Sequence, residues 1–213
     1  MAGHRREQLL SEIPSGYSPV LHLAAVHLIA ALGIALPIAS LQDPKAWELA
    51  FVPFFFAFAN FFEWSVHRGP MHHKWRFLGR LWERHTVIHH GFFHHDDLAI
   101  RSARELTYVL FPPWVTILFL VFVLPIPMAL WLAGQTNLAA LFLASSFGYY
   151  LVYEWFHLMH HLPEKGWAAS AVVQKIRAHH RFHHRPEAMS SGNFNVSFPL
   201  ADWVLRTWLK DSK

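Results

Sequence analysis

Residues 106–153 read LTYVLFPPWVTILFLVFVLPIPMALWLAGQTNLAALFLASSFGYYLVY, and these 48 residues include no charged side chain and no histidine. As a helix they would extend about 72 Å, at about 1.5 Å per residue, which is twice a hydrocarbon core of about 30 Å. The stretch therefore predicts a helical hairpin that crosses a membrane twice, with its break near Pro125, Pro127 and Gly134. Such a run is much longer than a core helix, which disfavours a soluble helical bundle.

Two more apolar stretches precede this one. Residues 13–42 and 49–62 contain no Asp, Glu, Lys or Arg. We therefore expect an all-α chain, one domain over residues 1–213, with four transmembrane helices at about 18–40, 49–66, 107–126 and 133–156. Apolar residues make up 54% of the chain and charged residues 15%, and cysteine is absent. This composition excludes a disulfide framework, a thiolate metal site and a catalytic thiol.

The basic residues predict the orientation of the spans. With four spans, 17 of the 18 Lys and Arg residues lie on one side of the membrane. The positive-inside rule then places both termini in the cytoplasm, together with a helical cap formed by the segments 67–105 and 162–213. The basic residues are interleaved with Trp, so we expect lipid head groups as partners and no nucleic acid. Residues 73–84 and 200–209 are expected to form amphipathic helices that lie in the head-group region or pack against the cap.

Histidine is unusually abundant. Fifteen of the 18 histidines fall within residues 67–95 and 157–184. Both windows follow predicted spans on the same side of the membrane, so they can meet. Residues three or four apart share a helix face, which groups His157 with His161, His85 with His89, and His180 with the pair that follows it. His67 and His72 are five apart, but Gly69 and Pro70 between them should break the helix and let His72 fold back.

Neutral imidazole binds zinc, copper, iron and nickel. Ten imidazoles in register are too many for one ion and suit two, which predicts a dinuclear metal site. These ten are His67, His72, His85, His89, His90, His157, His161, His180, His183 and His184. The other clustered histidines are expected to support the site or to lie on the surface: His73, His94, His95, His160 and His179. Because no hydrolytic motif is present, and only one Glu-x-x-His pair, iron with oxygen chemistry fits better than hydrolysis or a ferritin-like site.

The histidine spacing resembles a known family. The set His67-x4-His72, His85-x3-His89-His90, His157-x3-His161 and His180-x2-His183-His184 is similar to the fatty acid hydroxylase / sterol desaturase superfamily of integral membrane di-iron enzymes. Further similar text is RHTVIHHGFF (84–93), LFPPW (110–114), YEWFHLMHHLP (153–163) and NFNVSFPLADW (193–203). The resemblance covers about residues 50–208. The second motif departs from several members, which have two residues before the histidine pair where this chain has three.

The resemblance implies the activity, the cofactors and the partners. Members of the superfamily use O2 and two electrons at two iron ions to hydroxylate or desaturate C–H bonds of lipids, and the ten histidines would be the ligands. Zinc can replace iron in purified samples. We expect a membrane lipid as substrate and a separate electron-transfer protein, of the ferredoxin or cytochrome b5 type, because the sequence contains no cytochrome b5-like domain. Glu63 and Glu154 precede His67 and His157 by about one helical turn, and we expect them to accept N–H bonds from ligand imidazoles.

Several functions remain open at this point. The leading one is a lipid hydroxylase (a monooxygenase), and the same scaffold also suits a desaturase or a carotenoid or sterol hydroxylase. A membrane metal transporter, or a metal sensor or storage protein, is the alternative from another class. Transporters bind their substrates near the bilayer midplane, and the absence of charged residues and histidine from residues 106–153 argues against one.

Overall fold

The computed structural model describes the backbone of residues 2–210, and the side chains of these residues except 2–4, 113 and 117. The described part of the chain contains helices and no strand. It divides into two compact units. We call the first the histidine unit (the described residues of Met1–Pro19, Asn60–Leu110 and Trp155–Lys213) and the second the apolar unit (Val20–Ala59 and Phe111–Glu154). That the whole chain is one domain stays a prediction.

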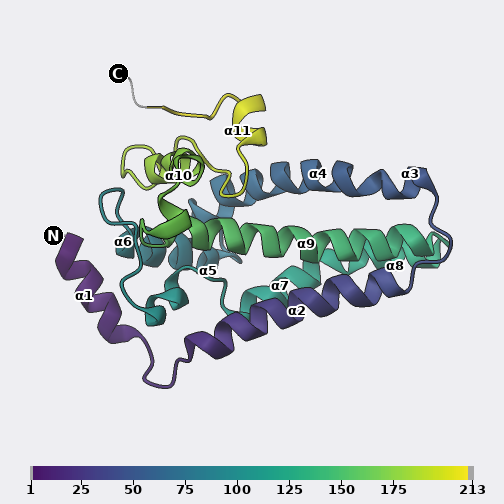
Figure 1. Ribbon diagram of the computed structural model, residues 1–213, viewed down its shortest axis with the longest axis horizontal. Coiled ribbons are helices and arrows are strands. Elements are labelled where there is room, and N and C mark those ends of the chain that lie inside the picture. The colour runs from purple at the N-terminus through teal and green to yellow at the C-terminus, as the bar shows by residue number, and fades with distance from the viewer. Residues whose placement is uncertain (1, 211–213) are drawn as a thin grey trace. The chain divides into compact units, whose positions relative to one another are not determined.

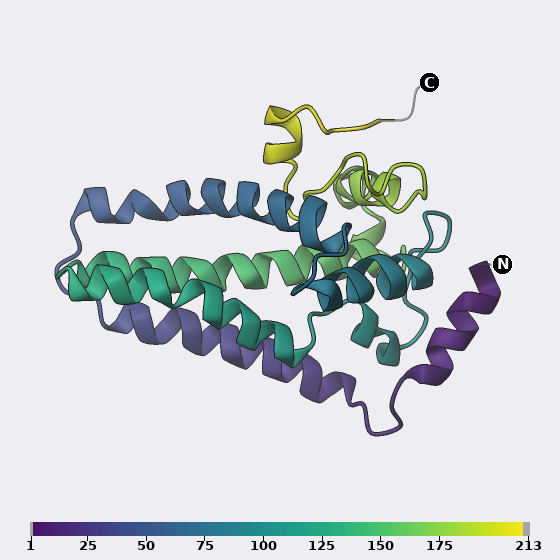
Figure 2. The ribbon, with the colours of Figure 1, turned by 180° about the vertical axis from the view of Figure 1, so that it is seen from behind.

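The apolar unit is a set of long helices. Its elements are α2 (Pro19–Ala39), α3 (Ala46–Leu49), α4 (Phe51–Val66, up to Ala59), α7 (Pro113–Val123), α8 (Pro125–Leu132) and α9 (Thr136–His161, up to Glu154). Helices α2, α7 and α9 lie side by side within this unit (Figures 1 and 2). They pack through a small core in which Val26 and Ala30 of α2 meet Tyr150 of α9, with Phe119 of α7 against them.

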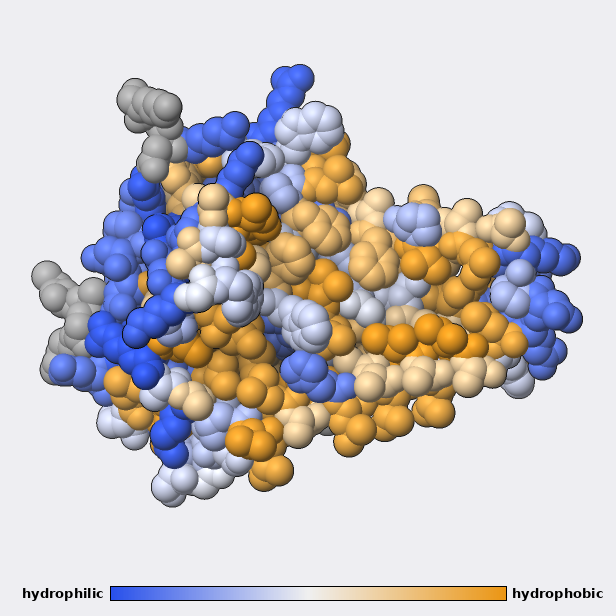
Figure 3. Space-filling model, in the orientation of Figure 1, coloured by the Kyte–Doolittle hydropathy of each residue, from blue (hydrophilic) through white to orange (hydrophobic). Residues whose placement is uncertain are grey.

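Within the described residues, three helical stretches are long and apolar enough to cross a membrane. They are Pro19–Ala39, Ala46–Met71 and Trp114–Leu132, with mean hydropathies of 2.1, 1.5 and 2.5. No more than 22% of each apolar window is buried. The exposed apolar side chains over these helices form the orange surface in Figure 3. A continuous apolar surface of this kind is unfavourable in water and suited to lipid, so the chain has the features of an integral membrane protein.

The predicted hairpin turns at Gly134, the last of the three positions named for its break, and not at Pro125 or Pro127. Helices α7 and α8 continue into each other through Leu124, whose carbonyl accepts from the Met128 N–H at 3.1 Å. Pro125 therefore does not end the helix, and the chain turns at Gly134, whose φ of 75° lies in the left-handed region. The predicted span 107–126 is displaced accordingly, because the helix starts only at Pro113. The fourth predicted span falls in α9, whose serines and tyrosines lower its hydropathy, and four spans stay a prediction.

The histidine unit is made of short elements. They are α1 (Ala2–Glu12), η1 (His67–Met71), α5 (Gly79–Trp82), η2 (Glu83–His89), α6 (His90–Phe92), η3 (Ala103–Tyr108), η4 (Gly166–Ala169), α10 (Ala171–His183) and α11 (Leu200–Val204), with the ends of α4 and α9. Helix α1 is held by Arg6, which is buried and pairs with Glu105 at 2.6 Å and with Asp97 at 3.0 Å. Leu9 and Phe92 lie in the apolar core beneath it.

The two predicted amphipathic helices are shorter than expected. In the stretch 73–84, helix begins only at Gly79. In the stretch 200–209, α11 ends at Val204, and Arg206 follows with a φ of 58°, which an α-helix does not accommodate. The aromatic residues of both stretches are nevertheless exposed, Trp75 by 52% and Trp203 by 69%.

Candidate metal centre

The predicted break between His67 and His72 is confirmed. The segment η1 is a π-helical turn in which Gly69 leaves helical geometry, with φ −82° and ψ −105°, and Pro70 supplies no N–H. The Gly69 carbonyl accepts from the N–H of His72 at 3.1 Å and from the N–H of His73 at 2.7 Å. The chain folds back at this point, and the rings of His67 and His72 stack with their centroids 5.0 Å apart.

A second π-helical turn, η2, contains His85. In a π-helix the hydrogen bond runs between residues five apart, so residues at that spacing lie on the same side. His85 accordingly meets His90, with their Nε2 atoms 3.1 Å apart. The sequence prediction placed His85 with His89, at α-helical spacing. That pairing is wrong in detail: their rings stack at 5.2 Å, but the two residues face different groups of histidines.

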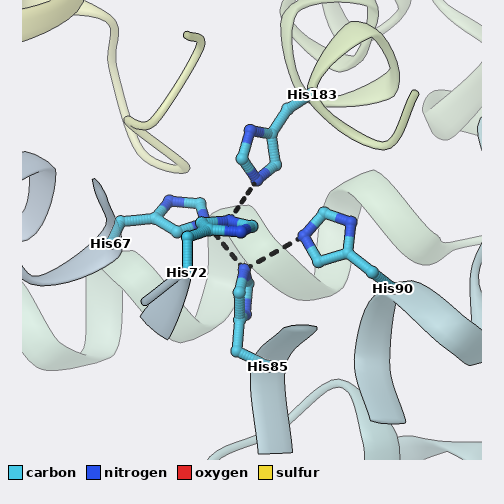
Figure 4. Close-up of side chains that lie close together, drawn as sticks. All are labelled: His67, His72, His85, His90 and His183. Atoms are coloured by element: carbon cyan, nitrogen blue, oxygen red, sulfur yellow. Dashed lines mark hydrogen bonds between the residues drawn. The ribbon is translucent and has the colours of Figure 1, made fainter. Parts of the chain in front are cut away.

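Five imidazoles form the first group. In Figure 4 their rings turn toward one another from η1, η2, α6 and the end of α10. The ligand atoms of all five lie within 4.8 Å of one another, and all five residues are buried. The closest Nε2 atoms belong to His67 and His85, at 2.7 Å. The members of this first group are His67, His72, His85, His90 and His183.

Four further imidazoles form the second group, which is also buried, with its ligand atoms within the same 4.8 Å. Its members are His89, His157, His161 and His180. His184 lies beside it, with its Nε2 3.2 Å from that of His89 and 3.0 Å from that of His180. The structure thus brings nine of the ten predicted histidines into two groups and places the tenth next to the second group.

Most of these imidazoles are held by the nitrogen that faces away from the group. Nδ1 of His89, His161, His183 and His184 lies 2.7–3.0 Å from the backbone carbonyls of Tyr108, Leu98, Gly192 and Phe93. Nδ1 of His67 contacts the Phe194 carbonyl in the same way. A carbonyl can only accept, so each Nδ1 carries the proton and each Nε2 presents a lone pair to the group.

His72 follows the same rule through a side chain. The Thr86 hydroxyl donates its proton to the Met71 carbonyl at 2.6 Å, and its oxygen lies 3.2 Å from His72 Nδ1. Because the hydroxyl proton is already used, Thr86 accepts from His72 Nδ1–H. Thr86 was not singled out in the sequence, and no pattern around it indicates this function.

These assignments bring lone pairs face to face. The Nε2 atoms of His72 and His183 are 3.0 Å apart, and those of His89 and His184 are 3.2 Å apart, although all four residues have their one proton on Nδ1. Two acceptors at this distance cannot hydrogen-bond to each other. A cation between them resolves the conflict, so the residues present fit metal ions coordinated by nitrogen.

Protonation does not provide that cation at neutral pH. Burial lowers the pKa of His183 to about 4, against the opposing effect of its hydrogen bond to the Gly192 carbonyl. Burial, and then the neighbouring His89, holds the pKa of His184 well below that of free imidazole. His183 and His184 are therefore neutral near pH 7, as metal ligation requires.

The two predicted carboxylates have other partners than those expected. Glu63 accepts from the backbone N–H groups of Val196 and Ser197, at 2.5 and 3.0 Å. Glu154 accepts from the Phe111 N–H at 3.0 Å and also bonds Tyr150. Both carboxylates thus accept from backbone N–H groups of loops and not from imidazoles. Imidazoles such as those of His183 and His184 donate their own N–H to backbone carbonyls instead. Glu63 therefore holds a loop that in turn holds histidines.

The remaining clustered histidines differ in environment. His160 is buried, lies with Nε2 2.8 Å from the Val196 carbonyl, and stacks on His180 at 4.6 Å. His179 donates from Nε2 to Asp202 at 3.0 Å. His73 is exposed and contacts the Arg68 carbonyl. His94 and His95 are half-buried and belong to neither group.

Comparison with known proteins gives one match. The family model described as fatty acid hydroxylase matches residues 52–207. No curated protein and no solved structure matches the chain. The matched range contains all ten histidines and most of the chain, so this protein belongs to the fatty acid hydroxylase family.

Proposed function

We propose that this chain is a lipid hydroxylase that inserts a hydroxyl group into an unactivated C–H bond of an acyl chain or related membrane lipid, using O2 and a dinuclear iron site. The observation that carries the proposal is the pair of buried histidine groups whose neutral Nε2 lone pairs oppose one another at 3.0–3.2 Å. Membership of the fatty acid hydroxylase family supports the substrate class.

The residues of the chain would divide the work as follows. The first group would hold one iron ion, and the second group, with His184, the other. Bound iron supplies the oxidation of the C–H bond by O2, which consumes two electrons and two protons and yields the alcohol and one water. The chain keeps the imidazoles neutral through burial and through their carbonyl contacts. His67 is 1% exposed and His180 0%, so these ligands are shielded from bulk water.

Sidedness and partner belong to the proposal as well. The distribution of Lys and Arg supports a cytoplasmic position for the termini and the histidine groups. The electrons would then come from a separate cytoplasmic protein, of the ferredoxin or cytochrome b5 type. Iron is proposed because the chemistry requires a redox metal, and zinc in a purified sample would reflect its stronger binding to nitrogen ligands.

The test compares the lipids of cells that express the wild type, His183→Ala and His73→Ala. His183 is a buried member of the first group, and His73 is exposed and outside both groups, so the second variant is the matched control. We expect the wild type and His73→Ala to yield a lipid heavier by one oxygen atom, and His183→Ala to yield none. The measurement is mass spectrometry of total lipid extracts.

Other outcomes would redirect the assignment. A product lighter by two hydrogen atoms would replace hydroxylation by desaturation on the same scaffold. Lipids that are identical in all three strains, together with metal accumulation that depends on the wild-type chain, would overturn the enzyme and favour a transporter. A purified wild-type chain with a single bound metal ion would overturn the dinuclear site.

A further inference from the structure

In one buried loop, residues 192–197, the backbone carbonyl of every second residue contacts a histidine ring nitrogen. In the segment 192–197, the carbonyls of Gly192, Phe194 and Val196 contact His183, His67 and His160 in turn. The segment is irregular, with Asn193 in the left-handed region at a φ of 56°. Phe194 and Val196 are 0% and 1% exposed, so the loop is part of the interior.

The opposite edges of the same peptide units are also occupied. The peptide that carries the Gly192 carbonyl donates its N–H, from Asn193, to the Thr207 carbonyl at 2.9 Å. A Cβ at Gly192 would lie 2.3 Å from that same Thr207 oxygen, so only glycine permits this approach. The next such peptide donates its N–H, from Asn195, to Asp202 Oδ2 at 2.7 Å.

Asp202 is the centre of this arrangement. Its carboxylate is fully buried and accepts four hydrogen bonds, from the N–H of Phe194 (3.0 Å), the N–H of Asn195 (2.7 Å), Thr207 Oγ1 (2.6 Å) and His179 Nε2 (3.0 Å). Its own N–H donates to Asn195 Oδ1 at 3.0 Å. A buried carboxylate with this many donors is held rigidly, and so are the peptides that donate to it.

A single peptide unit therefore links Asp202 to the first histidine group. The N–H of the Phe194–Asn195 peptide points to the carboxylate, and its carbonyl accepts from His67 Nδ1. A peptide whose N–H bonds an anion is polarised, which makes its carbonyl a better acceptor. A better acceptor at Nδ1–H places more electron density on the lone pair at Nε2, as a directly bonded carboxylate does for a metal-bound histidine.

We propose that Asp202 is a positioning residue for the first histidine group, and that it orients His67 and strengthens its Nε2 as a ligand through the Phe194–Asn195 peptide. The inference rests on the proposed function, because it assumes that the group binds a metal. The corresponding tether in the second group is different in kind. The peptide that holds His89 donates its other edge, the Val109 N–H, to the neutral Leu106 carbonyl at 3.1 Å.

The test is a titration of the metal-free full chain, in detergent, with Co²⁺ alone, followed by the visible absorption of the bound ion. We expect Asp202→Asn to weaken one of the two sites by about 10- to 100-fold and to shift the absorption of that site. The other site should bind as in the wild type. Thr207→Val is the control that keeps the charge of Asp202: it removes one donor to that carboxylate and the acceptor of Trp64 Nε1, and its effect on the affected site should be smaller than that of Asp202→Asn.

A purely structural contribution of Asp202 predicts another pattern. Equal weakening of both sites in Asp202→Asn, or weakening of the same size in Thr207→Val, would overturn the positioning function. Two Co²⁺ ions bound to Asp202→Asn with wild-type affinities would overturn this inference alone. A wild-type chain that binds no Co²⁺ would overturn the proposed function with it.

A second measurement needs no variant and so does not depend on the folding of Asp202→Asn. Hydrogen exchange of the wild type, measured by mass spectrometry with and without Co²⁺, compares the segments 193–198 and 107–111. Metal binding should tighten the contact from His67 through the peptide to Asp202. We therefore expect a larger gain in protection in 193–198 than in 107–111. An equal or smaller gain in 193–198 contradicts the proposal.

Discussion

The two histidine groups contain similar numbers of imidazoles but stand on different backbones. The second group takes His157 and His161 from one turn of α9, at ordinary α-helical spacing. The first takes His67 with His72 and His85 with His90, two pairs at a spacing of five. The first pair depends on the kink at Gly69 and Pro70, and the second on the π-helical turn η2. On the α-helix α10, moreover, His180 and His183 are three apart and were predicted to share a side, yet they belong to different groups. Helical spacing alone therefore does not assign a histidine to its group.

The largest expected effect comes from removing one ligand from each group. We expect His183→Ala to lose the metal of the first group and His180→Ala that of the second, so that each purified variant contains one ion per chain. Both should lose lipid hydroxylation to below detection, because the proposed reaction needs both ions. Metal analysis and lipid mass spectrometry measure the two quantities. Loss of both ions in either variant would show that the groups act as a single site.

The second-largest effect should be a loss of folding stability of the metal-free chain in acid. Burial lowers the folded-state pKa of His85, His90 and His184, whereas unfolded imidazoles titrate near pH 6.5. Below that pH the unfolded state binds more protons than the folded state. The stabilisation is therefore complete above about pH 6.5 and falls as the pH drops below it. Thermal unfolding between pH 7.5 and 5 should show a falling midpoint.

The metal-loaded chain is the control for this acid response. Bound ions compete with protons for the same Nε2 atoms, so loading should move the fall to lower pH. A metal-free midpoint that does not change between pH 7.5 and 5 would contradict the burial of neutral imidazoles in both groups.

A smaller effect is expected from Thr86→Val. The variant removes the acceptor for His72 Nδ1–H and leaves the ring of His72 in place. We expect about tenfold weaker metal binding in the first group and no change in the second. Ser65→Ala is the control, because Ser65 is exposed and bonds only back to Phe61 within α4. Equal weakening of both groups would mean that Thr86 supports the unit in general.

The smallest effect should come from His73→Ala. The ring is exposed, and its Nδ1 contacts only the Arg68 carbonyl. We expect metal content and product yield within about twofold of the wild type, since surface substitutions away from special features change stability little. A loss of one metal ion in this variant would add His73 to the metal ligands. It would then contradict the assignment of five histidines to the first group and four to the second.

Much of the fold follows from local chemistry. The apolar stretches predict α2 and α4 to within a few residues, and Gly69 with Pro70 predicts the kink after His67. Of the three positions predicted for the hairpin break, Gly134 forms the turn, whereas Pro125 sits at the first position of α8, where proline is tolerated. A proline predicts the end of a helix only where it lies in the helix interior, and not where it occupies the first turn.

The site is less fully predictable. Histidine spacing identifies nine residues that the structure gathers into two groups. It does not predict which group each histidine joins, because no sequence pattern in residues 83–89 indicates a π-helix. The partners of Glu63 and of Asp202 are N–H groups of a loop more than 130 residues from Glu63. Contacts of that kind depend on how the chain folds back, and local sequence carries no signal for them.

The π-helical turns also constrain how the chain can vary in length. A π turn is equivalent to an α-helix that has gained one residue. Deleting one residue between His85 and His90 would restore α-helical spacing, in which residues four apart still share a face, whereas inserting one would place the two histidines six apart and on different sides of the helix. Exchanging Val87 or Ile88 for another apolar residue leaves that count intact. Among related sequences, the stretch between His85 and His90 should thus tolerate substitutions, and the loss of one residue, better than the insertion of one.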